Sequence, residues 1–490
     1  MKKVTLIFIL AVSVVFSATG QTIDEALKYS QLFYGGTARF QAMGGAFTAL
    51  GGDLSVLSQN PAGLAVFRST EISLTPQMFY NNSSSTFGES TYDNLYKFNL
   101  NQIGIVAPLI SNSGEGLKSF NIGYSFNRTN NFNSNAIIKG VNNNSSMADY
   151  WADSAYDRYF TDITGAEGIA FEAWIIDTIT GSGGYEYGTV FSAYGDSANS
   201  TYGQTVRRII SNEGYSGEHA FSAAVNYNDK VYIGATIGIN RIKAYTRYEH
   251  LEADYDNVIP DFDNFTYTDV VETDGTGFSF KLGVIMKPVD MLRLGFSFHS
   301  PVIYRLHEYF YDSVNSGFDD GYTYDANNDP YRFEYTLTSP LRLNAGAAVQ
   351  IGKKGLISAD YEFVDYKMAR FSRASDDYNY FYENQDVKDI YDVAHNIRLG
   401  AELRITSGFY LRGGYALYGS AFAKGEDNEG NSYNQFSGGL GMRQSNFFFD
   451  LSYALMSNTQ KYFMYNHPDL DAADISYNRS LISATLGFRF

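Results

Sequence analysis

The strongest constraint on this chain is an alternation of large apolar residues with small or polar ones, which recurs from about residue 70 to the last residue. In residues 120–127, FNIGYSFN, every even position is apolar or aromatic and every odd position is small or polar. Residues 231–239, 278–286 and 482–490 follow the same pattern. Side chains of a strand alternate between two faces, so each run predicts a strand with one apolar face.

The connections between these runs alternate in length. About fourteen runs can be counted, each close to the ~9–11 residues that a tilted strand needs to cross a bilayer. Short connections include 228–230, 287–290 and 406–408, and long ones include 81–94, 128–218, 244–274 and 302–338. Short turns on one side and long loops on the other are typical of bacterial outer-membrane barrels. We therefore predict an all-β fold, a transmembrane antiparallel β-barrel whose two termini lie on the short-turn, periplasmic side.

The N-terminus has the features of a secretory signal peptide, which we place at residues 1–20. Lys2 and Lys3 precede an apolar run over 4–16, and Ala18-Thr19-Gly20 offers small residues for cleavage before Gln21. No later stretch is apolar for long enough to form a transmembrane helix. An exported chain without such a helix fits a barrel in the outer membrane of a Gram-negative cell.

Charge and cysteine content exclude several classes of function. Without the two signal-peptide lysines, 34 basic residues stand against 53 acidic ones, which argues against a nucleic-acid partner. The chain has no cysteine, so disulfides, thiolate metal sites and a cysteine nucleophile are excluded. His307-Glu308 begins a zinc-protease pattern, but Tyr311 stands where the second histidine is required. We expect no enzyme, no cofactor and no metal site.

Residues 35–67 differ from the rest of the chain. They contain three glycine pairs, at 35–36, 44–45 and 51–52, and end near Asn60-Pro61-Ala62-Gly63. The segment is too broken by glycine for a long helix. It is also too apolar for an exposed linker. We interpret residues 21–68 as a hatch, a compact plug folded into the lumen of a barrel formed by residues 69–490.

Two motifs of the hatch resemble a known family. Gly44-Gly45-Ala46-Phe47-Thr48-Ala49 and Asn60-Pro61-Ala62-Gly63-Leu64 are similar to the N-terminal hatch of the FadL/TodX family of outer-membrane hydrophobic-compound transporters. Residues 287–298, KPVDMLRLGFSF, resemble a turn and strand in the middle of the family's barrel.

The resemblance implies a fourteen-stranded barrel plugged by a hatch and diffusive uptake without ATP or a TonB partner. It further implies capture by hydrophobic extracellular loops, with release past the hatch or sideways beside a kinked strand. We expect the hatch to be gated by a set of residues in the two motifs: Gly44, Gly45, Phe47, Asn60, Pro61, Ala62 and Gly63.

The longest loop, 128–218, holds both tryptophans of the chain. We predict that aromatic residues of this loop capture the ligand: Trp151, Phe160, Phe171 and Trp174. The alternative is that these rings form the small core that a long loop needs for order. Gly123 interrupts an otherwise regular strand, so we place the strand kink there.

These observations favour an outer-membrane channel for passive uptake of hydrophobic small molecules, such as long-chain fatty acids or similar lipids and aromatics. Two alternatives remain open, a heme or large apolar-ring receptor with His250 as the first residue to examine, and a structural or adhesive barrel. Expected partners are the hydrophobic ligand, outer-membrane lipids, and the barrel assembly machinery, which would read the terminal Phe490. We expect a monomer.

Overall fold

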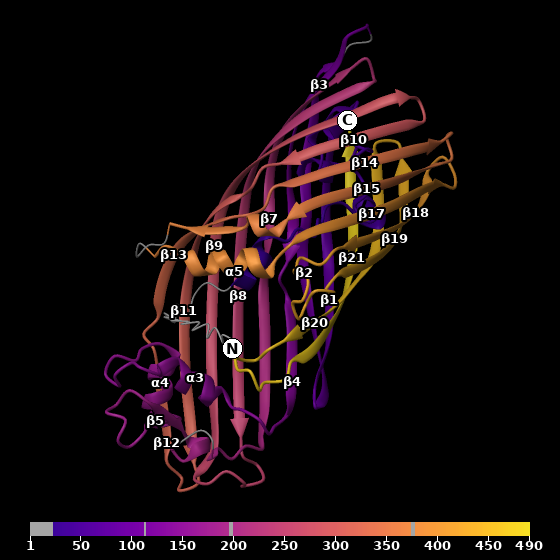
Figure 1. Cartoon of the computed structure of the whole chain (residues 1–490). Helices are drawn as coiled ribbons and strands as arrows, with labels where there is room; N and C mark the ends of the chain where they lie inside the picture. Colours follow the sequence, from indigo (N-terminus) through magenta and orange to yellow (C-terminus); the bar gives the residue numbers. More distant parts are fainter. Residues whose placement is uncertain (1–22, 112–113, 196–198, 374–377) are drawn as a thin grey trace, which may run out of the picture.

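The computed structural model describes residues 23–490 except 112–113, 196–198 and 374–377, so the predicted signal peptide lies outside the described residues. Within the described part, fourteen antiparallel strands form a closed barrel (Figure 1), because the last strand pairs with the first from Glu71 opposite Arg489 to Thr86 opposite Asp474. The strands in order around the wall are β1 (Glu71–Phe87), β2 (Glu89–Ser111), β3 (Leu117–Asn131), β7 (Gln204–Tyr227), β8 (Val231–Ala253), β9 (Phe262–Val289), β10 (Leu292–His299), β14 (Arg342–Ile351), β15 (Gly355–Asp365), β17 (Val393–Arg404), β18 (Phe409–Tyr418), β19 (Tyr433–Gln444), β20 (Phe447–Tyr462) and β21 (Ala473–Arg489). The predicted fold class is confirmed.

The two faces of the wall follow the alternation in the sequence. In β1, Ile72, Leu74 and Met78 are exposed on the outside, whereas Ser73 and Thr75 are buried on the inside. The outer face carries an apolar belt because lipid surrounds it, and the inner face is polar because it meets the hatch. No helix in the described part of the chain is long and apolar enough to cross a membrane.

The wall is much taller on one side than on the other. β7, β8 and β9 have 24, 23 and 28 residues, but β14 and β18 have only 10 each. Further strands extend the tall side: β4 (Ser134–Asn142), β11 (Ile303–Phe318), β12 (Thr323–Asn327), β13 (Tyr331–Thr338) and the short β16 (Arg370–Ser372). The strands of this side therefore continue beyond the belt as a curved shell.

This extension corrects several predicted loops. Residues 81–94 form a hairpin between β1 and β2 with Gly88 at its turn, and the loop predicted at 128–218 is strand at both ends. Residues 81–94 are mostly polar, and β4 and the start of β7 turn Ile138, Val206 and Ile210 into the cap core and not towards lipid, so these segments lack the alternation by which a lipid-facing strand is recognised. These segments are nevertheless strands, because their backbones form hydrogen bonds with neighbouring strands.

The wall is interrupted at two prolines. Residues 300–302, with Pro301, separate β10 from β11, and residues 339–341, with Pro340, separate β13 from β14. Proline has no N–H for the ladder, so it favours such a break. Beyond the second break β13 pairs with β16 over only three residues, 336–338. The 3-10 helix η5 (Tyr366–Met368) and helix α5 (Phe381–Ile390) follow there in the chain.

The pairing contradicts the kink predicted at Gly123. This residue pairs in register with Val106 of β2 and with Ser222 of β7. The register shifts of β3 against β7 lie near its two ends, between Leu117 and Ser119 and between Arg128 and Asn130. A glycine that keeps both ladder bonds does not bend a strand, so the breaks of the wall arise at the prolines instead.

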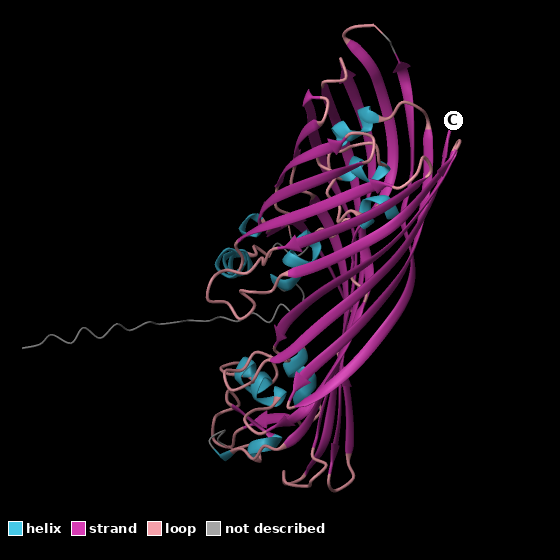
Figure 2. Ribbon diagram, turned by 90° about the vertical axis from the view of Figure 1, so that its right-hand side faces the viewer, coloured by secondary structure: helices cyan, strands magenta, loops and turns pink. Residues whose placement is uncertain are grey.

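The N-terminal segment lies inside the barrel, and Figure 2 shows its short helices enclosed by the strands. It comprises α1 (Ile23–Ser30), α2 (Ala38–Ala42) and the 3-10 helices η1 (Leu54–Ser58) and η2 (Pro61–Val66). Almost all residues from 37 to 65 are buried. α2, η1 and η2 lie towards the C-terminal end of the barrel, and α1 lies nearer its middle.

A cap of residues 143–195 and 199–203 covers the opposite end (Figure 1). It contains α3 (Met147–Ala155), α4 (Ala166–Glu172), β5 (Ile176–Thr178), β6 (Tyr187–Thr189) and η3 (Val190–Ser192). α3 begins with a capping box, in which Ser146 and Asp149 each bind a backbone N–H of the first turn. The apolar side chains of the cap pack with the far ends of the long strands in one continuous core.

Candidate transport route

The hatch is held in shape by its glycines and by one aspartate. Gly44 and Gly45 have φ of 62° and 74°, which only glycine adopts without strain. Asp53 caps η1 by accepting hydrogen bonds from Ser55 N at 3.0 Å and from Thr37 Oγ1 at 2.8 Å. This last bond ties η1 to the start of α2. The hatch is thus a folded unit and not a loosely inserted loop.

The wall is built to receive this unit without a gap. At Gly414 a Cβ would lie 2.2 Å from Gly44 N, and at Gly234 it would lie 2.4 Å from the carbonyl carbon of Pro61. Such distances are impossible, so these positions require glycine. Wall glycines that face hatch atoms in this way are Gly123, Gly234, Gly283, Gly295, Gly346, Gly400, Gly414 and Gly439. Their role was missed in the sequence, where each is one small residue on a polar face.

Asn60 joins two parts of the hatch to the wall. Its Nδ2 donates to Thr48 O at 2.6 Å and to Val284 O of β9 at 3.3 Å, and its Oδ1 accepts from Ala62 N at 3.1 Å. Asn60 is fully buried, and Pro61 occupies the first position of η2, where no N–H is needed. Of the predicted gate residues, Asn60 and Gly44 both bond directly to the wall, since Gly44 N donates to Ser437 Oγ of β19 at 3.2 Å.

Ion pairs secure the short side of the barrel. Glu362 accepts from Arg342 at 2.7 Å and from Arg398 at 2.9 Å, and all three are buried. Glu402 binds Arg412 of β18 at 2.7 Å and Arg39 of the hatch at 2.9 Å. Inward placement of these charges is expected because lipid would not solvate them. These ion pairs lie beside the hatch and leave the space on its cap side open.

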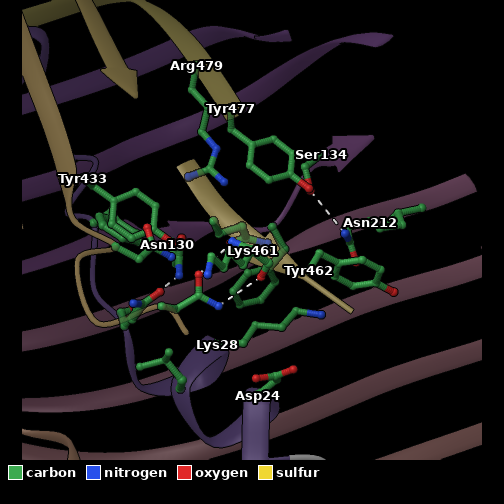
Figure 3. Close-up of a pocket in the computed structure, with 18 of the residues that line it drawn as sticks. Asp24, Lys28, Asn130, Ser134, Asn212, Tyr433, Lys461, Tyr462, Tyr477 and Arg479 are labelled. Atoms are coloured by element: carbon green, nitrogen blue, oxygen red, sulfur yellow. Dashed lines mark hydrogen bonds between the residues drawn. The ribbon is translucent and has the colours of Figure 1, made fainter. Parts of the chain in front are cut away.

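That space is a chamber of about 430 Å³ (Figure 3). It lies between α1, the cap-side ends of β3, β20 and β21, and the inner faces of β7 and β8. Eight rings contribute to its lining: Phe33, Phe132, Tyr248, Phe422, Tyr433, Tyr462, Phe463 and Tyr477. A smaller cavity of about 40 Å³ shares Phe33, Asn130, Asn131 and Arg479 with the chamber and continues towards Gln41 of the hatch.

The chamber is lined by several cations: Lys461 pairs with Asp427, and Lys28 lies near the carboxylates of Asp24, Glu25 and Glu308, whereas Arg479 forms no ion pair among the described residues. Figure 3 shows Arg479 extending from β21 and Lys28 from α1. The Arg479 guanidinium carbon lies 5.4 Å from the ring centre of Tyr477, and that of Arg128, in the smaller cavity, lies 4.5 Å from the ring centre of Tyr215. Among the ion pairs of the described residues, none includes Lys28, Arg128 or Arg479. Unpaired cations beside aromatic rings make the chamber attractive to an anion.

α1 forms the floor of the chamber and is anchored by buried polar groups. Lys28 Nζ donates to Thr246 Oγ1 at 3.1 Å, and Tyr29 OH donates to Thr273 Oγ1 at 2.9 Å. Burial lowers the pKa of Lys28, although the carboxylates of Glu25, Glu308 and Asp24 oppose the change. Burial, together with the neighbouring Glu308, raises the pKa of Glu25 well above its ordinary value.

On the other side of the hatch lies a separate cavity of about 220 Å³. It is lined by Leu50, Gly51 and Val66 of the hatch and by Met291 and Arg293 of β10 and the turn before it. Arg293 donates to Leu50 O at 2.6 Å and so closes this cavity against the hatch. The hatch therefore stands between two cavities, one on each side, and a solute that passed from one to the other would need the hatch to move.

The structure separates the four predicted capture residues. Trp151 is fully buried, 5.5 Å from the ring centre of Phe265, and belongs to the core of the cap. Phe160 and Phe171 stack with ring centres 6.3 Å apart, and Trp174 is 47 % exposed on the cap surface. None of the four lines the chamber. A single capture site built from all four is therefore wrong, and for Trp151 the alternative of a core residue holds.

His250 is not placed to ligate heme. Its side chain is fully buried between the rings of Phe265 and Tyr465, at 6.3 and 5.8 Å between ring centres, and its Nε2 lies 3.0 Å from Glu252 Oε1. A heme ligand needs an open slot over the imidazole, which this packing does not leave. Among the described residues no group of three or more potential ligands could hold a metal ion.

The fold and route define the class of this protein as an outer-membrane β-barrel whose lumen is closed by an N-terminal hatch. Residues 214–430 match the family model described as outer membrane protein transport protein (OMPP1/FadL/TodX), and residues 9–146 match that of an uncharacterised family, UPF0164. The part of the chain at residues 214–430 is therefore similar to the FadL/TodX family of outer-membrane hydrophobic-compound transporters.

Solved structures share the fold at low sequence identity. A FadL homologue from Pseudomonas aeruginosa matches with a TM-score of 0.58 at 13 % identity, covering 94 % of this chain and 100 % of its own. The Pseudomonas putida toluene transporter TodX matches with a TM-score of 0.52 at 12 % identity, covering 94 % and 100 %. No curated protein matches the chain. The resemblance that the hatch motifs indicated is confirmed.

Proposed function

We propose that this protein is a passive channel for hydrophobic small molecules that carry an anionic headgroup, such as long-chain fatty acids. The observation that carries the proposal is the chamber, where Arg479 lies beside the rings of Tyr433 and Tyr477 and forms no ion pair among the described residues. The rings would contact an apolar chain, and Arg479 would bind its headgroup. A neutral aromatic hydrocarbon would use only the rings.

The size of the chamber suits such a ligand. A volume of about 430 Å³ lies within the range of pockets that hold small organic molecules. Burial of ~400 Å² of apolar ligand surface contributes about 10 kcal/mol at 25 cal/mol per Å², before the cost of ordering the ligand. A site of this kind can collect dilute ligand from outside the cell. Release then depends on movement of the hatch towards the cavity on its other side.

The position of the two chain ends supports a periplasmic location for both. Glu71 at the start of β1 pairs with Arg489, and Phe490 N donates to Thr70 O at 3.0 Å. The short turns at 228–230, 352–354 and 445–446 share this rim with the end of the wall. In outer-membrane barrels short turns face the periplasm. The cap would then face the outside.

The same arrangement bears on partners. The Phe490 side chain is exposed at the end of β21, where the barrel assembly machinery could contact it. The apolar belt would lie in outer-membrane lipid, and closure of the sheet on itself leaves no free barrel edge for a second copy. We therefore propose that the protein works as a monomer.

Binding of matched ligands to the detergent-purified protein tests the proposal. We expect oleate to bind more tightly than oleyl alcohol, which has the same chain without the charge. Arg479→Gln should reduce the ratio of the two affinities about tenfold. An ion pair that is partly shielded from solvent, between the exposed and the fully buried case, contributes about 1–2 kcal/mol. Lys353→Gln, in an exposed short turn, is the control and should leave both affinities unchanged. Equal binding of the two ligands to the unaltered protein would refute an anionic headgroup.

A further inference from the structure

A second hollow lies on the surface of the cap and shares no lining residue with the chamber. It has a volume of about 190 Å³ and is formed where the cap meets the β11–β12 hairpin and the turn before β9. Figure 1 shows α4, β5 and β12 gathered at this end of the molecule. We call it the aromatic pocket. Its walls are five rings: Trp174, Tyr194, Phe318, Tyr322 and Tyr324.

Two of the rings are exposed, and the other three, Tyr194, Phe318 and Tyr324, are partly buried against the cap core. Trp174 is 47 % exposed and Tyr322 is 65 % exposed. Trp174 and Tyr324 lie 6.2 Å apart between ring centres with planes inclined at 49°, and Phe318 meets Tyr324 nearly edge-on at 5.8 Å. Inclined rings of this kind present several π faces to one small space. Clustered exposed aromatics on a soluble surface mark a binding site more often than chance placement.

The backbone holds these rings in place. Trp174, Tyr194 and Asp261 have φ of 59°, 58° and 62°, a conformation that non-glycine residues seldom adopt. Tyr194 OH donates to Trp174 O at 2.8 Å, and Ser316 Oγ of β11 donates to Ala173 O. The two sides of the pocket are thus bonded to each other, and the hollow is a formed feature of the fold.

The charge of the aromatic pocket has one sign. Asp261 and Asp320 complete the lining, and no lysine or arginine is among the described residues that line it. Neither aspartate forms an ion pair with another described residue. Burial raises the pKa of Tyr194 to about 12, and Asp177 and Asp261 add to the effect, which reflects the same negative surroundings. An anion would be repelled here, and a cation would gain from both carboxylates and rings.

We propose that the aromatic pocket binds a small organic cation of the alkylammonium class, of which choline is the simplest probe. Trimethylammonium groups contact aromatic faces through their polarised methyl groups and need no hydrogen-bond donor on the protein. A hollow of about 190 Å³ accommodates a group of this size. A phosphate two carbons away would meet Asp261 or Asp320, so the ligand is a free ammonium and not a phosphocholine headgroup. The site is independent of the chamber and of the function proposed for it.

Intrinsic fluorescence of the full mature protein in detergent tests this site. The chain has two tryptophans, and Trp151 is fully buried in the cap core, so Trp174 is the one in reach of solvent. We expect choline, at constant ionic strength, to quench the fluorescence saturably. Its uncharged carbon analogue, 3,3-dimethylbutan-1-ol, should require at least a tenfold higher concentration, because the pocket recognises charge. Phosphocholine should bind more weakly than choline.

Two substitutions separate the site from the stability of the cap. Asp261→Asn and Asp320→Asn each should weaken choline binding at least about fivefold. Asparagine tolerates the left-handed backbone at 261 and keeps the acceptor for Tyr322 N at 320, so both variants retain the fold. Asp256→Asn, an exposed aspartate outside the pocket, is the matched control.

Three results would overturn the proposal. The first is equal binding of choline and its uncharged analogue, which would make the hollow a plain apolar site. The second is saturable binding of methyl glucoside without binding of choline, which would make it a sugar site. The third is unchanged choline affinity in both aspartate variants. Oleate binding in the chamber should be the same in all these variants, so failure here does not bear on the transport proposal.

Discussion

Removal of the Asn60 side chain is expected to loosen the hatch without unfolding the barrel. In Asn60→Ala the Thr48 carbonyl and the Ala62 N–H lose their partner, at 2.6 and 3.1 Å, and the link to Val284 O is broken. Each buried group left without a partner costs about 1–3 kcal/mol, so the loss is roughly 2–6 kcal/mol for the two strongest bonds. Every 1.4 kcal/mol is about a factor of ten in the population of an opened hatch, so opening should rise by about 30-fold at the lower end of this range and by about 20,000-fold at the upper end.

Hydrogen exchange followed by mass spectrometry measures this opening. Amides of residues 44–66 should exchange faster by the same factor, while amides of β14 and β15 should keep their protection. Asn81→Ala is the matched control, because Asn81 is an equally buried asparagine of β1 that has no hydrogen-bond partner among the described residues. If hatch amides of Asn60→Ala exchange within threefold of the unaltered protein, Asn60 does not hold the hatch and the reasoning fails.

Three further predictions concern the wall, the lumen and the cap. Gly414→Ala should destabilise the folded barrel and lower its melting temperature, because the added Cβ would lie 2.2 Å from Gly44 N. Gly413→Ala is the control and should be neutral, because the nearest atom to its added Cβ lies 4.0 Å away. An unchanged melting temperature in both variants would contradict the close fit between wall and hatch. Glu362→Gln should lower the free energy of unfolding by about 3–5 kcal/mol, because the buried Arg342 and Arg398 lose their counter-charge. Resistance to heat in detergent measures this loss. A loss below about 1 kcal/mol would show that water solvates the three charged groups. Burial raises the pKa of Asp149 to about 6, so the folded cap binds a proton that the unfolded chain has released above about pH 4. Cap stability should therefore be highest below pH 4 and fall as the pH rises through 6, and limited proteolysis should cut residues 143–203 faster at pH 7.5 than at pH 5, a difference that Asp149→Asn should abolish.

The barrel fold could be predicted from the sequence because lipid imposes an alternating pattern of side chains on every wall strand. A strand that crosses the bilayer must turn one face to lipid, so Ile72, Leu74 and Met78 of β1 alternate with polar partners that could be counted without a structure. The hatch was equally visible, since paired glycines and Asn60-Pro61 imply tight turns in an apolar setting. Both predictions rest on short-range patterns.

Outside the bilayer that pattern disappears, and prediction failed there. Residues 81–94 and the start of β7 are strands although neither has the regular apolar alternation of a lipid-facing strand. The kink expected at Gly123 is absent because the glycine serves to admit Leu64 of the hatch, whose Cδ1 would lie 2.9 Å from an added Cβ. A glycine that makes room for a distant segment and one that bends its own strand look alike in a sequence.

The residues that carry the proposed functions were hidden for the same reason. Trp151 and Trp174 stand in one predicted loop, yet one is buried in the cap core and the other opens onto the aromatic pocket. Lys28 and Arg479 meet in the chamber from opposite ends of the chain.

The sequence by itself determined a lipid-embedded barrel with a lumenal plug, because the bilayer acts on each strand separately through the side chains of that strand. Which cations remain without a carboxylate, which glycines admit the hatch and which rings stay exposed were decided only by tertiary structure. These properties depend on strand register and on contacts between residues hundreds of positions apart, and no local pattern records either.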